Sequence, residues 1–132
     1  MRILGIDPGT ITMGYGIIDS RDDEVTVIDY GALTAPTRSP IADRLSYLYK
    51  GLLKIISRCH PDCVAIERPF VAKNAQAALA IGRAQAVAIL AAANKNIPSF
   101  EYMGTGKAAC LQLWSQQQGA NSADGSLPAW TI

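Results

Sequence analysis

The sequence predicts an α/β domain built on a mixed sheet of five strands. Strand-like apolar stretches occupy the first third of the chain, and two later segments show the spacing of apolar residues that is typical of helices. A further strand-like stretch follows each of these two segments. This order places the first strand parallel to the fourth, because a helical crossover returns the chain to a parallel neighbour. The 132 residues suffice for one hydrophobic core.

Three short segments near the N-terminus are typical of antiparallel strands joined by turns. Residues 2–7 form an apolar run that ends in an aspartate, and Pro8 and Gly9 then break it, since proline lacks the N–H that a central strand needs. Residues 13–19 and 25–33 are strand-like, with a polar segment between them. We therefore expect three antiparallel strands with tight connections.

Two segments predict helices. Apolar residues recur every three or four positions over residues 41–59, and Ser39 is expected to cap this helix with Pro40 as its first residue. Residues 74–94 are dominated by alanine and predict a long, thin helix whose two apolar sides suit a contact with a second copy of the chain. Two further strand-like runs remain, residues 63–67 and 97–102.

The charge is unevenly distributed along the chain. The net charge is only +1, but residues 31–100 carry nine basic and three acidic side chains. Such a segment is compatible with a phosphate-facing surface and equally with a solvated helix face. No apolar run approaches the roughly 20 residues that a membrane helix needs, so we expect a cytoplasmic protein without membrane contact.

Two strand-like runs end in a carboxylate, the first at Asp7 and the second at Glu67. If the two strands are parallel neighbours, both side chains lie at the carboxyl edge of the sheet, where open α/β sheets bind ligands. Two carboxylates so close repel each other unless one takes a proton or a cation lies between them. Oxygen ligands without a nearby histidine favour Mg²⁺ or Mn²⁺. The alternative is that both are strand-end residues that reach solvent.

The cysteines offer a second, weaker metal hypothesis. Cys59, His60 and Cys63 resemble half of a zinc site, but a structural zinc ion needs four ligands. The chain has one other cysteine and no second histidine, so packing at the end of the helix is the favoured interpretation. The odd number of cysteines also argues against a disulfide framework.

Several motifs, taken in order along the chain, resemble the RuvC family of Holliday-junction resolvases. A Gly-Ile-Asp-Pro-Gly-Thr motif at residues 5–10 is followed by Gly-Tyr-Gly at 14–16. An Ala-Ile-Glu-Arg-Pro-Phe motif at 65–70 precedes Ala-Lys-Asn-Ala at 72–75 and Gly-Arg-Ala-Gln-Ala at 82–86. The first motif alone is shared with actin-like ATPases, whereas the whole series is specific. The resemblance covers residues 1–102.

The resemblance implies an RNase H-like fold and a homodimer that hydrolyses phosphodiesters at four-way (Holliday) DNA junctions in recombination and repair. It assigns Asp7 and Glu67 as catalytic residues and as ligands of Mg²⁺, with Mn²⁺ as the other candidate. Paired metal ions can activate the attacking water and stabilise the leaving oxygen. It also suggests a branch-migration helicase complex as a partner.

The same resemblance predicts DNA-binding residues. Phe70 matches the aromatic residue that stacks on junction bases in the family, with a core phenylalanine as its alternative. The basic side chains would neutralise phosphates, while Asn74 would cap the following helix and face the phosphate, although each has an ordinary surface role as its alternative. The predicted set is Arg68, Phe70, Lys73, Asn74 and Arg83.

The resemblance stops after residue 102, so we expect a nuclease core over 1–102 and an atypical tail over 103–132. The family completes its site with two acidic residues on a final helix, but this tail contains one acid and no sustained periodicity. We expect that helix to be absent or replaced by an irregular tail, and the activity to be impaired. Reading the reverse-translated residues 107–122 one base later permits Gly-x-x-x-Lys-Glu-Gln-Ile, close to a family segment, which favours a frameshift near residue 103.

Two other functions fit parts of the sequence. A dimeric module that binds junction DNA without cutting it would explain the basic segment and the incomplete acidic set. A fragment of an actin-like ATPase is suggested only by residues 7–10, and that fold needs a second lobe for which the chain has no room.

Overall fold

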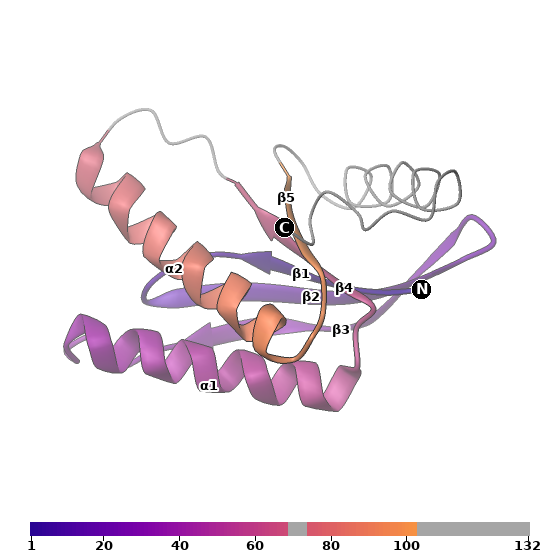
Figure 1. Cartoon of the computed structure of the whole chain (residues 1–132), viewed down its shortest axis with the longest axis horizontal. Helices are drawn as coiled ribbons and strands as arrows, with labels where there is room; N and C mark the ends of the chain where they lie inside the picture. Colours follow the sequence, from indigo (N-terminus) through magenta and orange to yellow (C-terminus); the bar gives the residue numbers. More distant parts are fainter. Residues whose placement is uncertain (69–73, 103–132) are drawn as a thin grey trace.

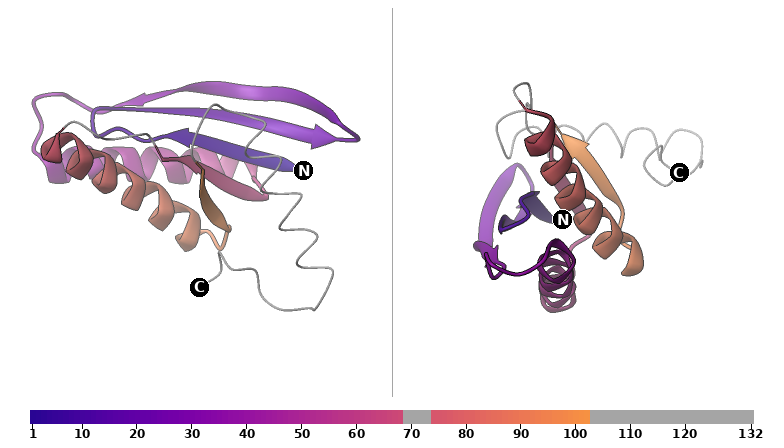
Figure 2. Two further views of the ribbon diagram at one scale, coloured as in Figure 1. Left: turned by 90° about the horizontal axis from the view of Figure 1, so that it is seen from above. Right: turned by 90° about the vertical axis from the view of Figure 1, so that its left-hand side faces the viewer.

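The computed structural model describes residues 1–68 and 74–102, which form a five-stranded sheet covered on one face by two helices (Figures 1 and 2). The order of the strands across the sheet is β3-β2-β1-β4-β5. Their bounds are β1 Arg2–Asp7, β2 Thr12–Arg21, β3 Glu24–Thr34, β4 Cys63–Glu67 and β5 Ser99–Tyr102, with helices α1 Ile41–Cys59 and α2 Ala75–Asn94.

The pairing confirms the predicted mixed sheet. β1 pairs with β2 and β2 with β3 in the antiparallel sense, whereas β4 is parallel to both β1 and β5. Both parallel connections run through a helix, α1 between β3 and β4 and α2 between β4 and β5. The carboxyl ends of β1 and β4 therefore meet at the same edge of the sheet.

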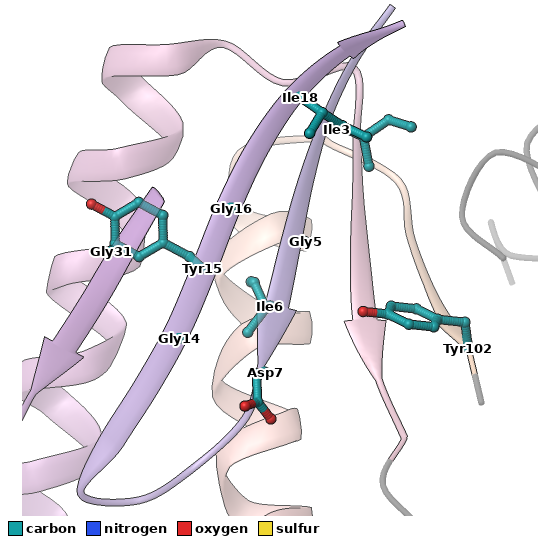
Figure 3. A pocket seen from close by; sticks show the side chains of 10 residues that line it. All are labelled: Ile3, Gly5, Ile6, Asp7, Gly14, Tyr15, Gly16, Ile18, Gly31 and Tyr102. Carbon is teal, nitrogen blue, oxygen red and sulfur yellow. The ribbon is translucent and has the colours of Figure 1, made fainter. Parts of the chain in front are cut away.

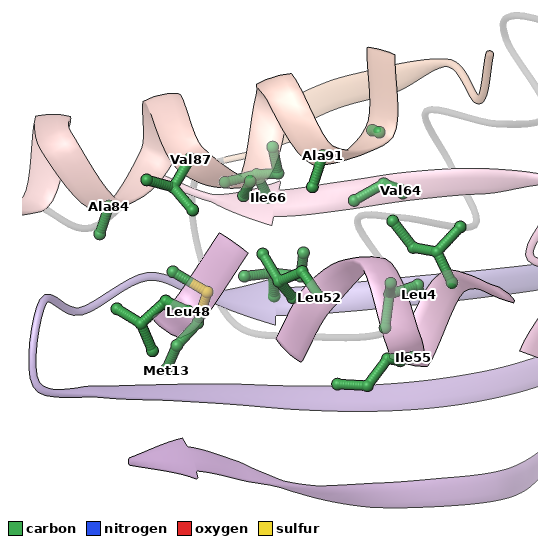
Figure 4. Close-up of a cluster of buried hydrophobic side chains, with 14 of the residues drawn as sticks. Leu4, Met13, Leu48, Leu52, Ile55, Val64, Ile66, Ala84, Val87 and Ala91 are labelled. Atoms are coloured by element: carbon green, nitrogen blue, oxygen red, sulfur yellow. The ribbon is translucent and has the colours of Figure 1, made fainter. Parts of the chain in front are cut away.

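The main core lies between the sheet and the two helices (Figure 4). Leu48 and Leu52 of α1 are fully buried there against inward-facing residues of the strands, and small residues of α2 such as Ala88 allow that helix to approach closely. A smaller cluster, formed by Ile3, Ile18, Cys63 and Ala65, lies on the other face of the sheet. Alternate residues of β1 and β4 thus face opposite clusters, as strand geometry requires.

The two helices begin differently. Asn74 caps α2 as predicted, because its side-chain oxygen accepts hydrogen bonds from the main-chain N–H groups of Gln76 and Ala77 at 2.8 and 3.2 Å. The prediction for α1 is wrong by one residue: Pro40 is the N-cap and the helix begins at Ile41. The ring fixes φ of Pro40 at a helical −54°, but its ψ of 154° is extended.

Helix α2 contradicts the expectation that no segment has the length and composition of a membrane span. It contains 20 residues, and its mean hydropathy reaches 1.4. The sequence interpretation missed it because alanine, rather than leucine or isoleucine, supplies most of the apolar character. In this fold the alanine-rich face of α2 packs against α1 and β4.

Leu52→Ala is expected to lower the free energy of unfolding by about 2–5 kcal/mol, because it removes fully buried methyl groups and leaves a cavity. Urea denaturation followed by circular dichroism measures this loss. Tyr47→Ala on the same helix is the control: its side chain is 48% exposed, and we expect a loss below about 1 kcal/mol. Equal losses for the two variants would contradict this assignment of the core.

Candidate active site

The structure brings Asp7 and Glu67 together, as predicted from the strand ends. Asp7 is the last residue of β1 and Glu67 is the last residue of β4. The parallel register pairs Ile6 with Ile66, so the two acidic residues are the next in line on adjacent strands. Both side chains lie on the sheet face away from the helices, since each is separated by two positions from Gly5 or Ala65 on that face.

Burial and a neighbouring negative charge both raise the pKa of Glu67. The main cause is desolvation of the partly buried carboxyl group, which raises its pKa above the usual value. The negative charge of Asp7 and a side-chain hydrogen bond with Asp7 raise the pKa of Glu67 further. The two carboxyl groups are therefore neighbours at the end of the sheet, and a bound cation would relieve the repulsion between them.

A shallow hollow adjoins Asp7 on the same face of the sheet (Figure 3). Its volume is about 340 Å³, and Gly5, Gly14 and Gly16, which have no side chains, are among the residues that line it. Gly14 is the cross-strand partner of Asp7, and Gly5 is the partner of Gly16. The wall on the β5 side is Tyr102, whose ring is labelled in Figure 3. Asp7 is therefore accessible from the hollow on this face of the sheet.

The turn after Asp7 requires glycine at position 9. A Cβ atom on Gly9 would lie 2.2 Å from the carbonyl oxygen of Thr12, which is a main-chain atom and cannot rotate away. Pro8, which precedes it, is buried. The Pro-Gly pair thus ends β1 directly after the carboxylate and returns the chain into β2.

Glu67 is held from two sides. On one side it pairs with Tyr102 of β5, and the N–H of the next residue, Arg68, donates to the carbonyl oxygen of Tyr102 at 2.8 Å. On the other, the side-chain amide of Gln85 donates to the carbonyl oxygen of Glu67 at 3.4 Å. The sequence analysis assigned no role to Gln85 or Tyr102. The sequence contains one indication for each residue: Gln85 lies within the motif at 82–86, and Tyr102 is the last residue of the last predicted strand.

The predicted DNA-binding residues are only partly described. Arg68 directly follows Glu67 and is exposed, and Arg83 is exposed on α2. Asn74 caps α2, as described above, which confirms the first of its two predicted roles. Phe70 and Lys73 lie outside the described residues. The structure therefore places one cation, Arg68, beside the carboxylate pair along the chain.

The donor set fits a hard divalent cation better than zinc. Carboxylate oxygens are the ligands that Mg²⁺ and Mn²⁺ prefer. Within residues 1–68 and 74–102, no three or more His, Cys, Asp or Glu side chains gather as a metal-binding group, so Asp7 and Glu67 form a pair without a third acid. Cys59 and Cys63 belong to clusters on opposite faces of the sheet, which argues against the zinc hypothesis.

The sheet order, the two crossover helices and the paired carboxylates define an RNase H-like protein. The solved structure of T. thermophilus RuvC in complex with Holliday junction substrate superimposes with a TM-score of 0.74 over 93% of this chain and 75% of that chain, at 20% identity. A second Thermus thermophilus RuvC structure gives 0.69 over 98% and 86%, at 21% identity. These likenesses establish the fold.

The chain belongs to the RuvC family of crossover junction endodeoxyribonucleases, whose family model matches residues 3–113. A crossover junction endodeoxyribonuclease RuvC of Dehalococcoides mccartyi is 57% identical over 102 residues, which are 77% of this chain and 61% of that protein. The RuvC of Chloroflexus aurantiacus is 50% identical over 102 residues, 77% of this chain and 62% of its own. The matched region thus spans about three fifths of these relatives. Membership decides against the actin-like ATPase interpretation.

Glu67→Gln is expected to stabilise the metal-free protein at neutral pH. Because the folded protein has a raised pKa at Glu67, it binds this proton more tightly than the unfolded chain does, so wild-type stability falls as pH rises between the two pKa values. Glutamine does not titrate, and the advantage of the variant should therefore appear as pH rises above the ordinary glutamate range. Thermal unfolding in EDTA between pH 4 and 8 measures it.

The control for loss of one negative charge is Glu101→Gln, an exposed residue of β5. A pH profile of Glu67→Gln that runs parallel to the wild-type profile would show that Glu67 carries no such penalty.

Proposed function

We propose that this chain is a structure-selective endonuclease of the RuvC type, acting on phosphodiesters at four-way DNA junctions in recombination and repair. The observation that carries this proposal is the position of Asp7 and Glu67 side by side at the carboxyl ends of two adjacent parallel strands. Family membership supports the choice of substrate.

Asp7 and Glu67 would hold Mg²⁺ or Mn²⁺. A bound cation supplies charge neutralisation at the reacting phosphate and a more acidic water molecule. The chain's own residues would orient this ion: the Pro8–Gly9 turn fixes Asp7, and pairing with β5 fixes Glu67. With two acids instead of the four that the family resemblance implies, we expect weak metal retention and slow cleavage.

Exposed positive side chains would bind the DNA backbone. Arg68 follows Glu67 directly, and Arg83 lies exposed on α2. We propose that both neutralise phosphates together with Lys73, that Phe70 stacks on a junction base, and that Asn74 faces the backbone from its capping position.

Helix α2 would form the contact of a homodimer. Leu79 and Leu90 are 56% and 55% exposed, and their spacing of eleven positions puts them on one face of the helix. Exposed leucines on one helix face favour contact with a second copy of the chain. Such a dimer would place two carboxylate pairs on one junction. The branch-migration helicase partner and the cytoplasmic location are proposed from family membership.

The unusual composition of residues 103–132 would result from a change of reading frame near residue 103. The permitted Gly-x-x-x-Lys-Glu-Gln-Ile in the next frame supports this proposal. Sequencing the coding DNA across codons 98–115 tests it, and an intact frame without an insertion or deletion would refute it.

A binding assay and a cleavage assay on the same synthetic four-way junction test the function. We expect the purified chain to bind the junction more tightly than a linear duplex of equal length, with little cleavage in 10 mM Mg²⁺, a concentration on the order of that used to saturate weak oxygen sites. Asp7→Asn should keep the binding and remove any residual cleavage. Equal affinity for junction and duplex would refute the substrate assignment.

A dimeric junction-binding module is the second candidate function, and the lack of a third acidic ligand near Asp7 among the described residues favours it. It predicts junction binding that is identical in Mg²⁺ and in EDTA. The endonuclease proposal instead predicts that residual cleavage appears only with the cation.

A further inference from the structure

Gln85 reaches from α2 to the end of the strand that carries Glu67. Its side-chain Nε2 atom donates to the main-chain carbonyl oxygen of Glu67 at 3.4 Å. Gln85 is partly buried, and its neighbours Ala84 and Val87 on the helix belong to the core. The contact therefore joins a rigid part of α2 to the last residue of β4.

The carbonyl group of Glu67 needs such a donor because β4 has lost its neighbour on the β1 side. The pairing of β1 with β4 ends at Ile6 and Ile66. β1 itself ends at Asp7, and Pro8 follows, which has no N–H to donate. A main-chain carbonyl at a strand end is satisfied by water or by a side chain, and here the amide of Gln85 is in reach.

Electrostatic repulsion from Asp7 tends to displace Glu67. Asp7 and Glu67 are the next residues after the Ile6–Ile66 pair on adjacent strands, and two neighbouring carboxylates repel each other when both are ionised. On the β5 side, the main chain next to Glu67 is fixed by the hydrogen bond from the N–H of Arg68 to the carbonyl oxygen of Tyr102. The register with β1 ends at Ile66, so the hydrogen bond from Gln85 adds an attachment at the point where the pairing with β1 stops, and it opposes separation of the two carboxyl groups.

We infer that Gln85 is a positioning residue for Glu67: its amide anchors the end of β4 so that the Glu67 carboxylate stays beside Asp7, ready to share a divalent cation. The inference rests on the metal site proposed above. It assigns to Gln85 a role through the main chain of a ligand residue, and no contact with metal or DNA. Such supporting contacts commonly change metal affinity by about 10- to 100-fold.

The test is Mn²⁺ binding, measured by the electron paramagnetic resonance signal of free Mn²⁺ during titration. Gln85→Met has a side chain of similar length without a donor, so it preserves packing and removes the hydrogen bond. We expect its dissociation constant for Mn²⁺ to rise about tenfold. Its midpoint of urea denaturation should stay close to wild type, since the contact is long and partly exposed.

Two further proteins separate positioning from a general effect on the fold. Gln76→Met, on the exposed first turn of the same helix, is the matched control and should bind Mn²⁺ like wild type. In a Glu67→Gln background, Gln85→Met should have no further effect on the weakened Mn²⁺ binding, because the residue through which Gln85 acts has already lost its charge. If Gln85→Met does not fold, Gln85→Asn, which is too short to reach the carbonyl, takes its place.

The outcomes are distinct. Wild-type protein that takes up no Mn²⁺ would overturn the metal site and, with it, the role of Gln85. Tight Mn²⁺ binding by wild type that survives in both Gln85 variants would overturn the role of Gln85 and leave the metal site intact. An equal loss in the Glu67→Gln background would show that Gln85 acts by another route.

Discussion

Asp7→Asn is expected to abolish the stabilisation that Mg²⁺ or Mn²⁺ gives to the folded protein. A ligand that binds only the folded state adds about 2.7 kcal/mol to the free energy of unfolding at a concentration of 100 times its dissociation constant. The variant retains one carboxylate, Glu67, and a single carboxylate holds these cations poorly. Thermal unfolding of wild type and variant, in EDTA and across a Mn²⁺ titration, measures the difference.

The same substitution should raise stability when no metal is present. Asparagine removes one of the two charges in contact, so the repulsion that helps to raise the pKa of Glu67 disappears. The signs of the two effects are therefore opposite: the variant unfolds at a higher temperature in EDTA and at a lower one in saturating Mn²⁺. Asp43→Asn, an exposed acid in the first turn of α1, is the control and should respond to Mn²⁺ like wild type. A Mn²⁺ response in Asp7→Asn as large as in wild type would exclude Asp7 as a ligand.

The adjacent positions of Asp7 and Glu67 could be predicted from the sequence because they depend on topology alone. Each acid ends a strand-like run, and a helical segment separates the second run from the hairpin strands. If the two acidic residues end their strands at the same edge of the sheet, the residues before them are paired, and the structure does pair Ile6 with Ile66. No side-chain conformation had to be known.

The attachment of Glu67 to α2 could not be predicted in the same way. The hydrogen bond from Gln85 joins residues 18 positions apart, and its existence depends on the height at which α2 crosses β4. Alanines such as Ala88 form most of the buried face of α2, and a helix so rich in alanine has no strong sequence preference for one face or one position along the sheet. The error at Pro40 has a related origin, since its ring fixes φ but leaves ψ to the surrounding chain.

Gly9→Ala should destabilise the protein by about 3 kcal/mol, at the upper end of ordinary single substitutions. The added Cβ atom would lie 2.2 Å from the carbonyl oxygen of Thr12, so the turn between β1 and β2 must open to accommodate it. Urea denaturation measures this loss. Gly16→Ala is the matched control on β2: no atom lies within 4 Å of its added Cβ, and alanine restricts the unfolded chain, so stability should stay equal or rise by about 0.4–1 kcal/mol.

The two glycine variants also separate stability from metal binding. An opened turn moves the main chain two residues after Asp7, so the part of the Gly9→Ala population that remains folded should bind Mn²⁺ more weakly than wild type. Gly16→Ala leaves that turn unchanged and should keep the wild-type affinity, although its methyl group enters the hollow beside Asp7. Unchanged Mn²⁺ affinity in folded Gly9→Ala would mean that Asp7 is positioned by its pairing with Gly14 across β2, and that the turn only connects the strands.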